Sequence, residues 1–321
     1  MYQSDSRLRE LSPTGKDILV TGGAGFIGSH LVDTLVADNR VTVLDNLSTG
    51  TTNNVNEEAQ FVQGDIRTLS SLPDLVETAD IAFHQAGFVS VEESMKKPLT
   101  SHQHNVTATA RLLESARQGD TRVISASSAA IYGQPSQLPI AETEPANPES
   151  PYGLDKLSVD HYTRLFNELY GLPTVTLRYF NVYGPRQSAA SYSGVISTFL
   201  EQAHKGAELT IHGDGAQTRD FVHVSDIVAA NLLAATTDHT GKAYNIGTGT
   251  ATSIQELASI IRSAASTEAG VTHLPDRPGD ITHSCADISR ATDYLGYNPS
   301  ISLESGLRTL VEQSIPSSLS S

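Results

Sequence analysis

Short apolar runs rich in β-branched residues alternate with longer amphipathic segments along the first half of the chain. The runs have the length of strands, and the segments repeat with the periodicity of helices. We predict helices near 26–38, 69–78, 99–118 and 151–170. The predicted strands are 17–22, 40–45, 59–65, 79–87, 121–127 and 173–181. This alternation predicts an α/β fold, a doubly wound parallel sheet with helices on both faces.

The helix predicted at 151–170 has the clearest ends. Ser150 suits the N-cap, Pro151 suits the first helical position, and Gly171 with Pro173 ends the helix. We expect one stripe of this helix to face the sheet, formed by Leu154, Leu157, His161, Leu165 and Leu169.

Beyond the last of these strands the alternation loosens. We predict a nucleotide-binding domain over 1–181, with a return segment near 219–248. Residues 182–218 and 249–321 then form a smaller C-terminal α/β domain for substrate. The first sixteen residues contain no apolar signal core, so they are expected to form a short arm.

Composition limits the choice of partners and compartment. The net charge is −15, which argues against nucleic acid or an anionic membrane as a partner. The acidic balance suits a saline cytoplasm and an ordinary acidic bacterial protein equally well. Cys285 is the only cysteine, which excludes an internal disulfide and fits a reducing cytoplasm. No apolar run is long enough to span a membrane. We predict a cytoplasmic protein.

A glycine-rich turn joins the first predicted strand to the first predicted helix. Gly22, Gly25 and Gly28 lie in "TGGAGFIG", where missing side chains let the backbone approach a pyrophosphate at a helix N-terminus. The context is that of a Rossmann-type dinucleotide site. Asp45 ends the second strand, where a carboxylate accepts from ribose hydroxyls and repels a 2′-phosphate. The pattern favours NAD over NADP as the cofactor.

Three further residues suggest redox chemistry at a hydroxyl carbon. Ser128 follows the fifth strand, and Tyr152 and Lys156 lie one helical turn apart. A tyrosine ionises near pH ~10, but a neighbouring lysine cation and a nicotinamide cation stabilise its phenolate. Ser128 would orient a sugar hydroxyl, and Tyr152 would remove its proton while hydride passes to NAD.

Several motifs together resemble one family. The stretches "TGGAGFIG", "SSAAIYG", "YGLDK", "YFNVYGPRQ", "RDFVHVSD" and "RPGDI" are similar to the extended short-chain dehydrogenase/reductases, in their nucleotide-sugar epimerase branch. The resemblance covers about residues 17–314. It implies a Rossmann domain, a C-terminal domain that binds a nucleoside diphosphate sugar, and a homodimer joined by a helix bundle.

The resemblance also implies which residues bind NAD. Asp65, at the end of the third strand, would meet the adenine, and Gly87 departs from the family's usual alanine. The implied cofactor residues are Gly22, Gly25, Phe26, Ile27, Gly28, Asp45, Asn46, Ser48, Thr49, Gly50, Asp65, Ile66, Gln85, Ala86, Gly87, Asn105, Tyr152, Lys156 and Tyr179. We predict no metal site, because His102 and His104 lie two residues apart on a predicted helix and point to different sides.

A second group is implied for the substrate. Its members are Ser90, Ser128, Asn181, Val195, Thr210, His212, Arg219, Arg277, Asp280 and Ser284. Forked guanidinium groups suit the diphosphate, so Arg219 and Arg277 are assigned to it together with Asn181. Asp280 would hold a ribose hydroxyl. Ser284 stands at the position that gates the sugar pocket.

The residues after Ser128 separate the possible reactions. Sugar dehydratases of this family carry an Asp-Glu pair there, whereas this chain has Ala129 and Ala130. Methyl groups cannot protonate a leaving hydroxyl, so we predict a UDP-hexose 4-epimerase that works through a 4-keto sugar. The small Ser284 side chain leaves room for UDP-N-acetylhexosamines beside UDP-glucose and UDP-galactose. The alternatives are an epimerase of UDP-glucuronate or a GDP-sugar, a dehydratase or reductase, and a silent NAD-sensing regulator.

Overall fold

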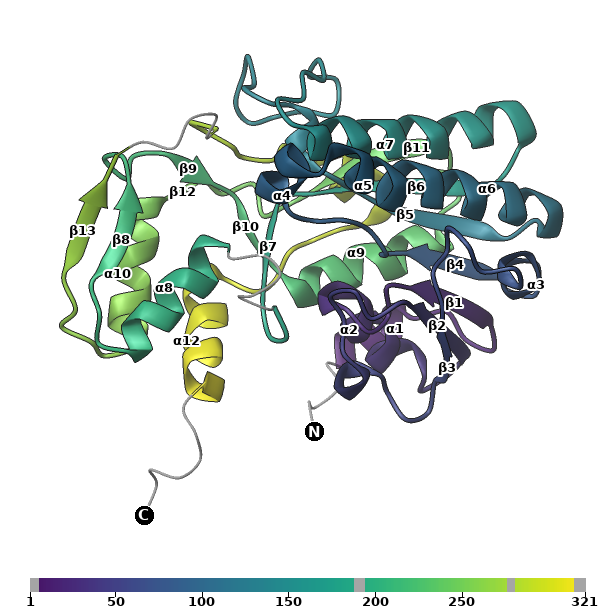
Figure 1. The fold of residues 1–321 in the computed structure, drawn as a ribbon, viewed down its shortest axis with the longest axis horizontal. Helices are drawn as coiled ribbons and strands as arrows, with labels where there is room; N and C mark the ends of the chain where they lie inside the picture. The colour runs from purple at the N-terminus through teal and green to yellow at the C-terminus, as the bar shows by residue number, and fades with distance from the viewer. Residues whose placement is uncertain (1–5, 188–193, 276–280, 315–321) are drawn as a thin grey trace.

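A parallel sheet forms the centre of the molecule. The computed structural model describes residues 6–187, 194–275 and 281–314. Seven parallel strands of these residues form the main sheet (Figure 1). In spatial order they are β11 (Lys242–Ile246), β6 (Thr174–Tyr179), β5 (Arg122–Ser128), β4 (Ile81–His84), β1 (Asp17–Thr21), β2 (Arg40–Asp45) and β3 (Gln60–Gln63). The predicted α/β class and all six predicted strands are confirmed. The strand order reverses between β1 and β4, which leaves a crevice at the carboxyl ends of the strands.

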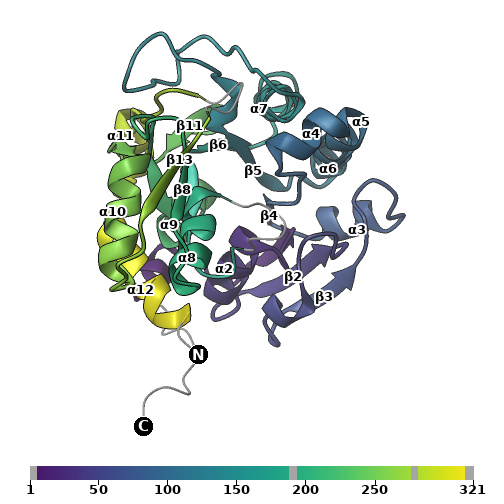
Figure 2. The ribbon, with the colours of Figure 1, turned by 60° about the vertical axis from the view of Figure 1, so that its left-hand side comes forward.

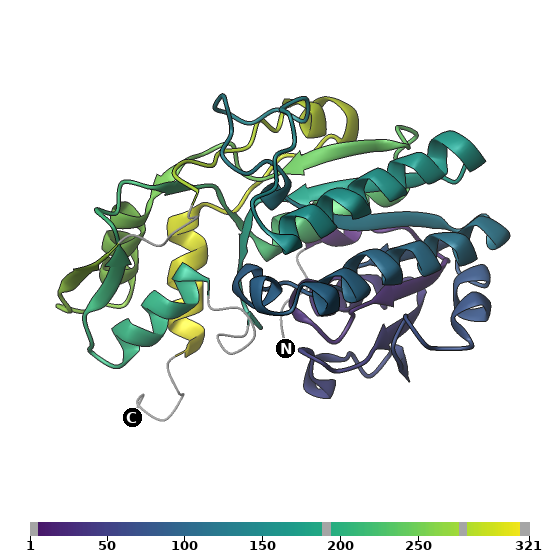
Figure 3. The same cartoon turned by 45° about the horizontal axis from the view of Figure 1, so that its top comes forward.

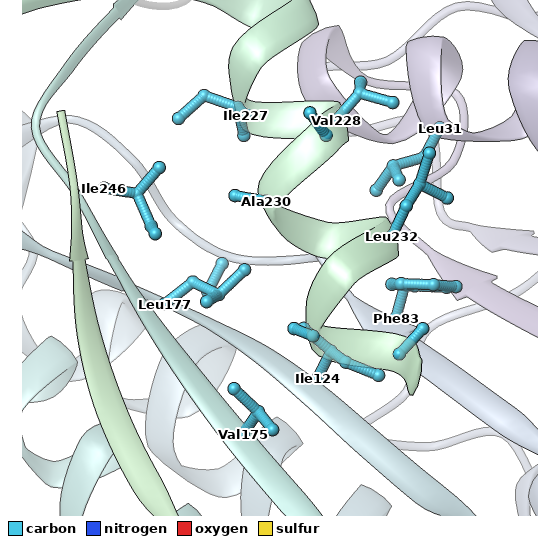
Figure 4. Packing of buried hydrophobic residues seen from close by; sticks show 14 of the residues in the cluster. Leu31, Phe83, Ile124, Val175, Leu177, Ile227, Val228, Ala230, Leu232 and Ile246 are labelled. Carbon is cyan, nitrogen blue, oxygen red and sulfur yellow. The ribbon is translucent and has the colours of Figure 1, made fainter. Parts of the chain in front are cut away.

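One face of the sheet is covered by helices from distant parts of the sequence. They are α1 (Ser6–Leu11), α2 (Phe26–Leu35), α9 (Val224–Thr236) and α11 (Ser289–Leu295). Figure 4 shows Ile227 and Ala230 of α9 above Leu177 of β6, and Leu31 of α2 next to Val228 and Leu232 on the other side of α9. Such burial supplies most of the stability of an amphipathic helix.

The described part of the predicted N-terminal arm is a short helix that packs on the rest of the protein. Residues 6–11 form helix α1, which packs on α2 and α9. Leu8 enters the core of the sheet, and the Arg7 guanidinium lies 3.0 Å from the buried Asp226 carboxylate. A helix of six residues is too short for its periodicity to be recognised in the sequence.

The opposite face carries α3 (Leu72–Glu77), α6 (Ala108–Gly119) and α7 (Pro151–Tyr170), and α6 and α7 run side by side (Figure 3). The helix predicted at 99–118 is continuous but not regular. It consists of α5 (Pro98–His102), the π-helical turn η2 (Gln103–Thr107) and α6. Turns of this kind are common near functional sites.

Helix α7 has the predicted ends but not the predicted orientation. Ser150 Oγ accepts from the Gly153 N–H at 3.1 Å, and Gly171 ends the helix in the left-handed conformation. Most of the leucine stripe, however, faces outward, with Leu154 55% and Leu169 59% exposed, whereas Leu157 is half-buried against a small apolar cluster. The side turned to the sheet is mostly small, polar or charged: Gly153, Asp155, Lys156, Val159, Asp160 and Thr163. Polar partners on the sheet, such as Arg178 for Asp160 at 2.7 Å, replace apolar packing there.

The remaining elements form a smaller C-terminal part (Figure 2). Its core is shared by α8 (Val195–His204), β8 (Leu209–His212), α10 (Ile254–Ala264), β13 (Val271–Leu274) and α12 (Leu303–Ser314). Two small ladders link it to the main sheet: β7 (Asn181–Tyr183) with β10 (Phe221–His223), and β9 (Thr218–Arg219) with β12 (Thr252–Ser253). In the range predicted for the return segment, α9 packs on the main sheet and β11 pairs with β6 at its edge. Helix α11 follows in the range predicted for the second part, but it packs on the main sheet.

No helix in the described ranges is both long enough and apolar enough to cross a membrane.

Candidate active site

A large cavity lies where the carboxyl ends of the strands meet the C-terminal part. Its volume is about 1510 Å³, and both parts of the molecule line it. A pocket for one small ligand has a volume of ~300–1,000 Å³, so this cavity has room for a cofactor and a substrate together.

The glycine turn closes one end of the cavity. Gly22 has φ +71°, a conformation that favours glycine, and a Cβ there would lie 2.6 Å from the Ala86 nitrogen. A Cβ on Gly28 would lie 2.2 Å from the Gly22 carbonyl oxygen, so no larger residue fits this turn. Gly25 is the N-cap of α2, and no side chain caps the helix. The N–H groups in the first turn of α2 are therefore placed to bind the phosphates of a dinucleotide.

Asp45 lies at the cavity edge, where β2 ends. Its Oδ2 accepts from the Ala24 N–H at 3.0 Å and its Oδ1 from the Leu47 N–H at 2.8 Å. These two bonds tie the glycine turn to the loop after β2. Each carboxylate oxygen keeps a further lone pair, so Asp45 is able to accept from ribose hydroxyls.

Ser128, Tyr152 and Lys156 all line the same cavity. Lys156 is 6% exposed, its Nζ donates to the Ala126 carbonyl at 2.9 Å, and it lies 6.0 Å from the centre of the Tyr152 ring. Burial lowers the pKa of Lys156 to about 8, against the opposing effect of the neighbouring Asp155 carboxylate. Ser128 ends β5, and its Oγ accepts from the Ala130 N–H at 3.2 Å. The three predicted residues therefore line one cavity, with Lys156 close to Tyr152.

The far end of the cavity is lined by the C-terminal part. Arg219 and Ser284 line the cavity with four other residues predicted for the substrate, Asn181, Val195, Thr210 and His212, whereas Ser90 lines it from the segment after β4. Thr210 is fixed by Gln202, whose amide bonds both its hydroxyl and its N–H. Ser284 is buried, and its N–H donates to the Thr218 carbonyl at 3.1 Å.

Comparison with known proteins agrees with this geometry. The sequence model of the NAD dependent epimerase/dehydratase family matches residues 18–247. The chain belongs to this family. The prediction of an NAD-dependent enzyme of the nucleotide-sugar epimerase type is confirmed.

Several similar proteins carry epimerase names. A UDP-glucose 4-epimerase of Mycolicibacterium smegmatis is 37% identical over 303 residues, which are 92% of this chain and 97% of the relative. The structure of UDP-N-acetylglucosamine 4-epimerase from Methanobrevibacter ruminantium, in complex with UDP-N-acetylmuramic acid, is 39% identical with TM-score 0.90. The match covers 94% of this chain and 98% of that one. The UDP-glucose 4-epimerase of Thermotoga maritima with UDP-glucose is 38% identical with TM-score 0.89, covering 92% and 97% of the two chains.

Most residues predicted to bind NAD line the cavity of this epimerase/dehydratase, and two do not. Gly50 packs on the backbone of Ala24, where a Cβ would come within 2.8 Å of the Ala24 carbonyl carbon. Asn105 is buried behind the cavity wall, and its amide bonds both backbone groups of Phe88. Both would therefore act by holding loops rather than by touching the cofactor. Arg277 and Asp280 lie outside the described residues.

Asp65 has a partner that sequence reasoning missed. The Arg67 guanidinium binds both of its carboxylate oxygens, at 2.9 and 2.6 Å, and Asn46 Nδ2 donates to it at 3.1 Å. These bonds hold the pKa of the Asp65 carboxyl far below its usual range. Asp65 remains a negatively charged part of the cavity wall, close to where adenine was predicted.

Arg186 lines the cavity and was absent from the predicted site. It has φ +67°, and its guanidinium lies 2.7 Å from the Asp33 carboxylate on α2. This pair links the loop after β7 to the helix that follows the glycine turn. The glycine and proline before Arg186 are the sequence signal that marks this turn.

Proposed function

We propose that the protein is an NAD-dependent 4-epimerase of UDP-hexoses, acting on UDP-glucose and UDP-galactose and also on their N-acetyl forms. The observation that carries the proposal is the buried Lys156 beside Tyr152, in a cavity shared by the glycine turn and by Ser284. The epimerase relatives support the reaction class, and the choice of sugar is our own inference from the pocket.

The cofactor would lie along the edge formed by the glycine turn, Asp45 and Tyr179. Bound NAD supplies a hydride acceptor that returns the hydride to the same sugar carbon. Tyr179 is held in place by Gln85 and Asn231, whose amides bond its hydroxyl. Burial raises the pKa of Tyr179 to about 12, so this tyrosine stays neutral and supports the site rather than acting as a base.

Tyr152 is assigned the proton transfer. Its backbone is fixed in the first turn of α7, where its N–H donates to Ser94 Oγ at 3.2 Å. The Lys156 ammonium stabilises the phenolate, which takes the proton of the sugar 4-hydroxyl as the carbon is oxidised. Ser128 hydrogen-bonds the same oxygen. Tyr152 returns the proton after the 4-keto sugar has turned over.

Ala129 and Ala130 support epimerisation over dehydration. Both line the cavity directly after Ser128, and neither carries a group that transfers a proton. A dehydratase needs an acid there to expel water. A silent regulator would have no need of the Tyr152–Lys156 pair.

We also propose a homodimer joined through the outer face of α7. Its exposed leucines and tyrosines form an apolar face that is large for a surface in contact with water: Leu154, Tyr162, Leu165, Leu169 and Tyr170. A second copy of the same helix would cover it in a symmetric contact.

The test is a substrate panel of UDP-glucose, UDP-N-acetylglucosamine, UDP-glucuronate and a GDP-hexose, with products separated by chromatography. We expect 4-epimers of the first two. Tyr152→Phe should lower turnover at least ~100-fold, because the proton-transfer group is lost. Tyr162→Phe is the matched control, since Tyr162 lies on the exposed side of the same helix. Conversion of UDP-glucuronate alone, or full activity of Tyr152→Phe, would contradict the proposal.

A further inference from the structure

Asp155 lies directly before Lys156 on α7, and the proposed chemistry does not use it. The residue is 4% exposed and does not line the cavity. Its Oδ2 accepts from Ser101 Oγ at 2.5 Å, and its Oδ1 lies 3.3 Å from His102 Nδ1. A buried carboxylate is costly unless it is paired, so its presence beside a buried lysine calls for an explanation.

The contacts of Asp155 continue to the loop next to Lys156. Asn105 Nδ2 donates to Ser101 Oγ at 3.4 Å and to the Phe88 carbonyl at 3.2 Å, and Asn105 Oδ1 accepts from the Phe88 N–H at 3.0 Å. We call Asp155, Ser101 and Asn105 the carboxylate bracket. The bracket joins α7, α5 and η2 to the loop after β4.

Gly87 shows how close this loop lies to the ammonium. A Cβ at Gly87 would lie 2.7 Å from Asn105 Oδ1 and 3.4 Å from Lys156 Nζ. Because residue 87 has no side chain, both Asn105 Oδ1, at the end of the carboxylate bracket, and Lys156 Nζ can lie close to it. The departure from the family's usual alanine makes room for this approach.

The other ionisable groups around Lys156 do not balance its charge. His84 on β4 is neutral, because burial lowers its pKa to about 3, and Tyr152 is the proposed base. Arg178 on β6 is paired with Asp160. On α4 (Val91–Lys96) and just beyond it, Glu92 and Glu93 pair with Lys96 and Lys97 at the surface. Among the described residues, Asp155 is the carboxylate that offsets the cost of burying the Lys156 ammonium.

We propose that Asp155 is a positioning residue that keeps Lys156 protonated at the working pH and, through the carboxylate bracket, holds the Gly87–Phe88 loop against it. The inference rests on the proposed function, because the charge of Lys156 matters if Tyr152 is the base. The active pair is a Tyr152 phenolate beside a Lys156 ammonium. Loss of the ammonium proton removes the cation that stabilises the phenolate.

The test is Asp155→Asn, which keeps the shape and removes the charge, measured as the pH profile of kcat for the NAD-loaded enzyme. We expect the alkaline limb to move to lower pH by about one unit, the size of shift that one neighbouring charge produces. A second readout is tyrosinate absorbance, which is unobscured because the chain contains no tryptophan. The rise in tyrosinate absorbance that is missing in Tyr152→Phe belongs to Tyr152. We expect this rise to occur at higher pH in Asp155→Asn than in the wild type.

Two further variants separate charge from packing. His102→Gln removes a contact of Asp155 but keeps the carboxylate, so the alkaline limb should stay in place. If Asp155→Asn does not fold, Asp155→Ser is smaller and neutral and must give the same shift. The inference would be overturned if the pH profile of kcat for Asp155→Asn superimposes on that of the wild type, or if kcat falls equally at every pH. In either case, epimerisation by the wild type leaves the proposed function standing. A wild-type protein that converts no nucleotide sugar would instead overturn the proposed function.

Discussion

At the scale of single residues, the site depends on buried polar groups whose charge states are set by their surroundings. Lys156 is a buried cation with a lowered pKa. His84, the last residue of β4, is buried and neutral. Its Nδ1 bonds Thr21 Oγ1 at 2.8 Å and its Nε2 bonds Thr109 Oγ1 at 3.0 Å, which ties β1 and β4 to α6.

His84 should make the fold sensitive to acid. Its folded pKa of about 3 lies below the 6.5 of an exposed histidine, so the unfolded chain binds the proton first as the pH falls. The contribution of His84 to the free energy of unfolding is present above pH ~6.5 and is lost between there and pH ~3, by about 1.4 kcal/mol per pH unit. Urea unfolding of His84→Gln and of the wild type at a series of pH values gives the free energy of unfolding as a function of pH. We expect this free energy to fall less steeply with falling pH in His84→Gln. Parallel curves would contradict this account.

Ser284 tests the proposed choice of sugar. It is buried in the cavity wall, and a tyrosine in its place would fill space that an acetamido group needs. Ser284→Tyr should lower kcat/KM for UDP-N-acetylglucosamine at least ~10-fold more than for UDP-glucose, as steric discrimination in a pocket allows. Ser284→Ala keeps the space in the pocket, so its kcat/KM values for both sugars should equal those of the wild type. Equal losses for the two sugars in Ser284→Tyr would show that the residue does not gate the pocket.

At the scale of secondary-structure elements, period and turn signals predicted the strands and most helix ends. The orientation of α7 could not be predicted in this way, because most of its apolar positions face outward. Its sheet-facing side instead binds the sheet through the Asp160 carboxylate and through the Thr163 carbonyl, which accepts from Thr174 Oγ1. Periodicity identifies an apolar face but does not say what covers it. The π turn at Asn105 was likewise missed, since it leaves no break in the helical pattern.

The outer face of α7 should control assembly. Leu165→Glu places a charge on the exposed apolar face, and we expect the dimer to dissociate because a desolvated carboxylate would be unpaired there. Sedimentation velocity of variant and wild type measures the outcome. Leu138→Glu, an equally exposed leucine in a loop away from α7, is the control and should leave assembly unchanged. A monomeric wild type would overturn the dimer proposal.

At the scale of the whole molecule, the cavity lies between the sheet edge and the C-terminal part, and residues far apart in sequence complete it. The glycine turn, Asp45 and the Tyr152–Lys156 pair could be predicted because local sequence determines each of them. Arg186 and the Arg67 partner of Asp65 could not, because their roles depend on contacts between loops. The role of the buried Asp220 could not be predicted for the same reason. Its carboxylate accepts from the N–H groups of Thr248, Gly249 and Ala286 and so joins the two parts of the molecule.

The central claim is that hydride leaves and returns to one sugar carbon while Tyr152 moves the hydroxyl proton. UDP-glucose carrying deuterium at C4 tests it most directly, with the product examined by mass spectrometry and NMR. We predict UDP-galactose that keeps the deuterium at C4, because the hydride is returned within the closed cavity. Epimer with hydrogen from solvent at C4, or no epimer from any UDP-hexose, would contradict the account.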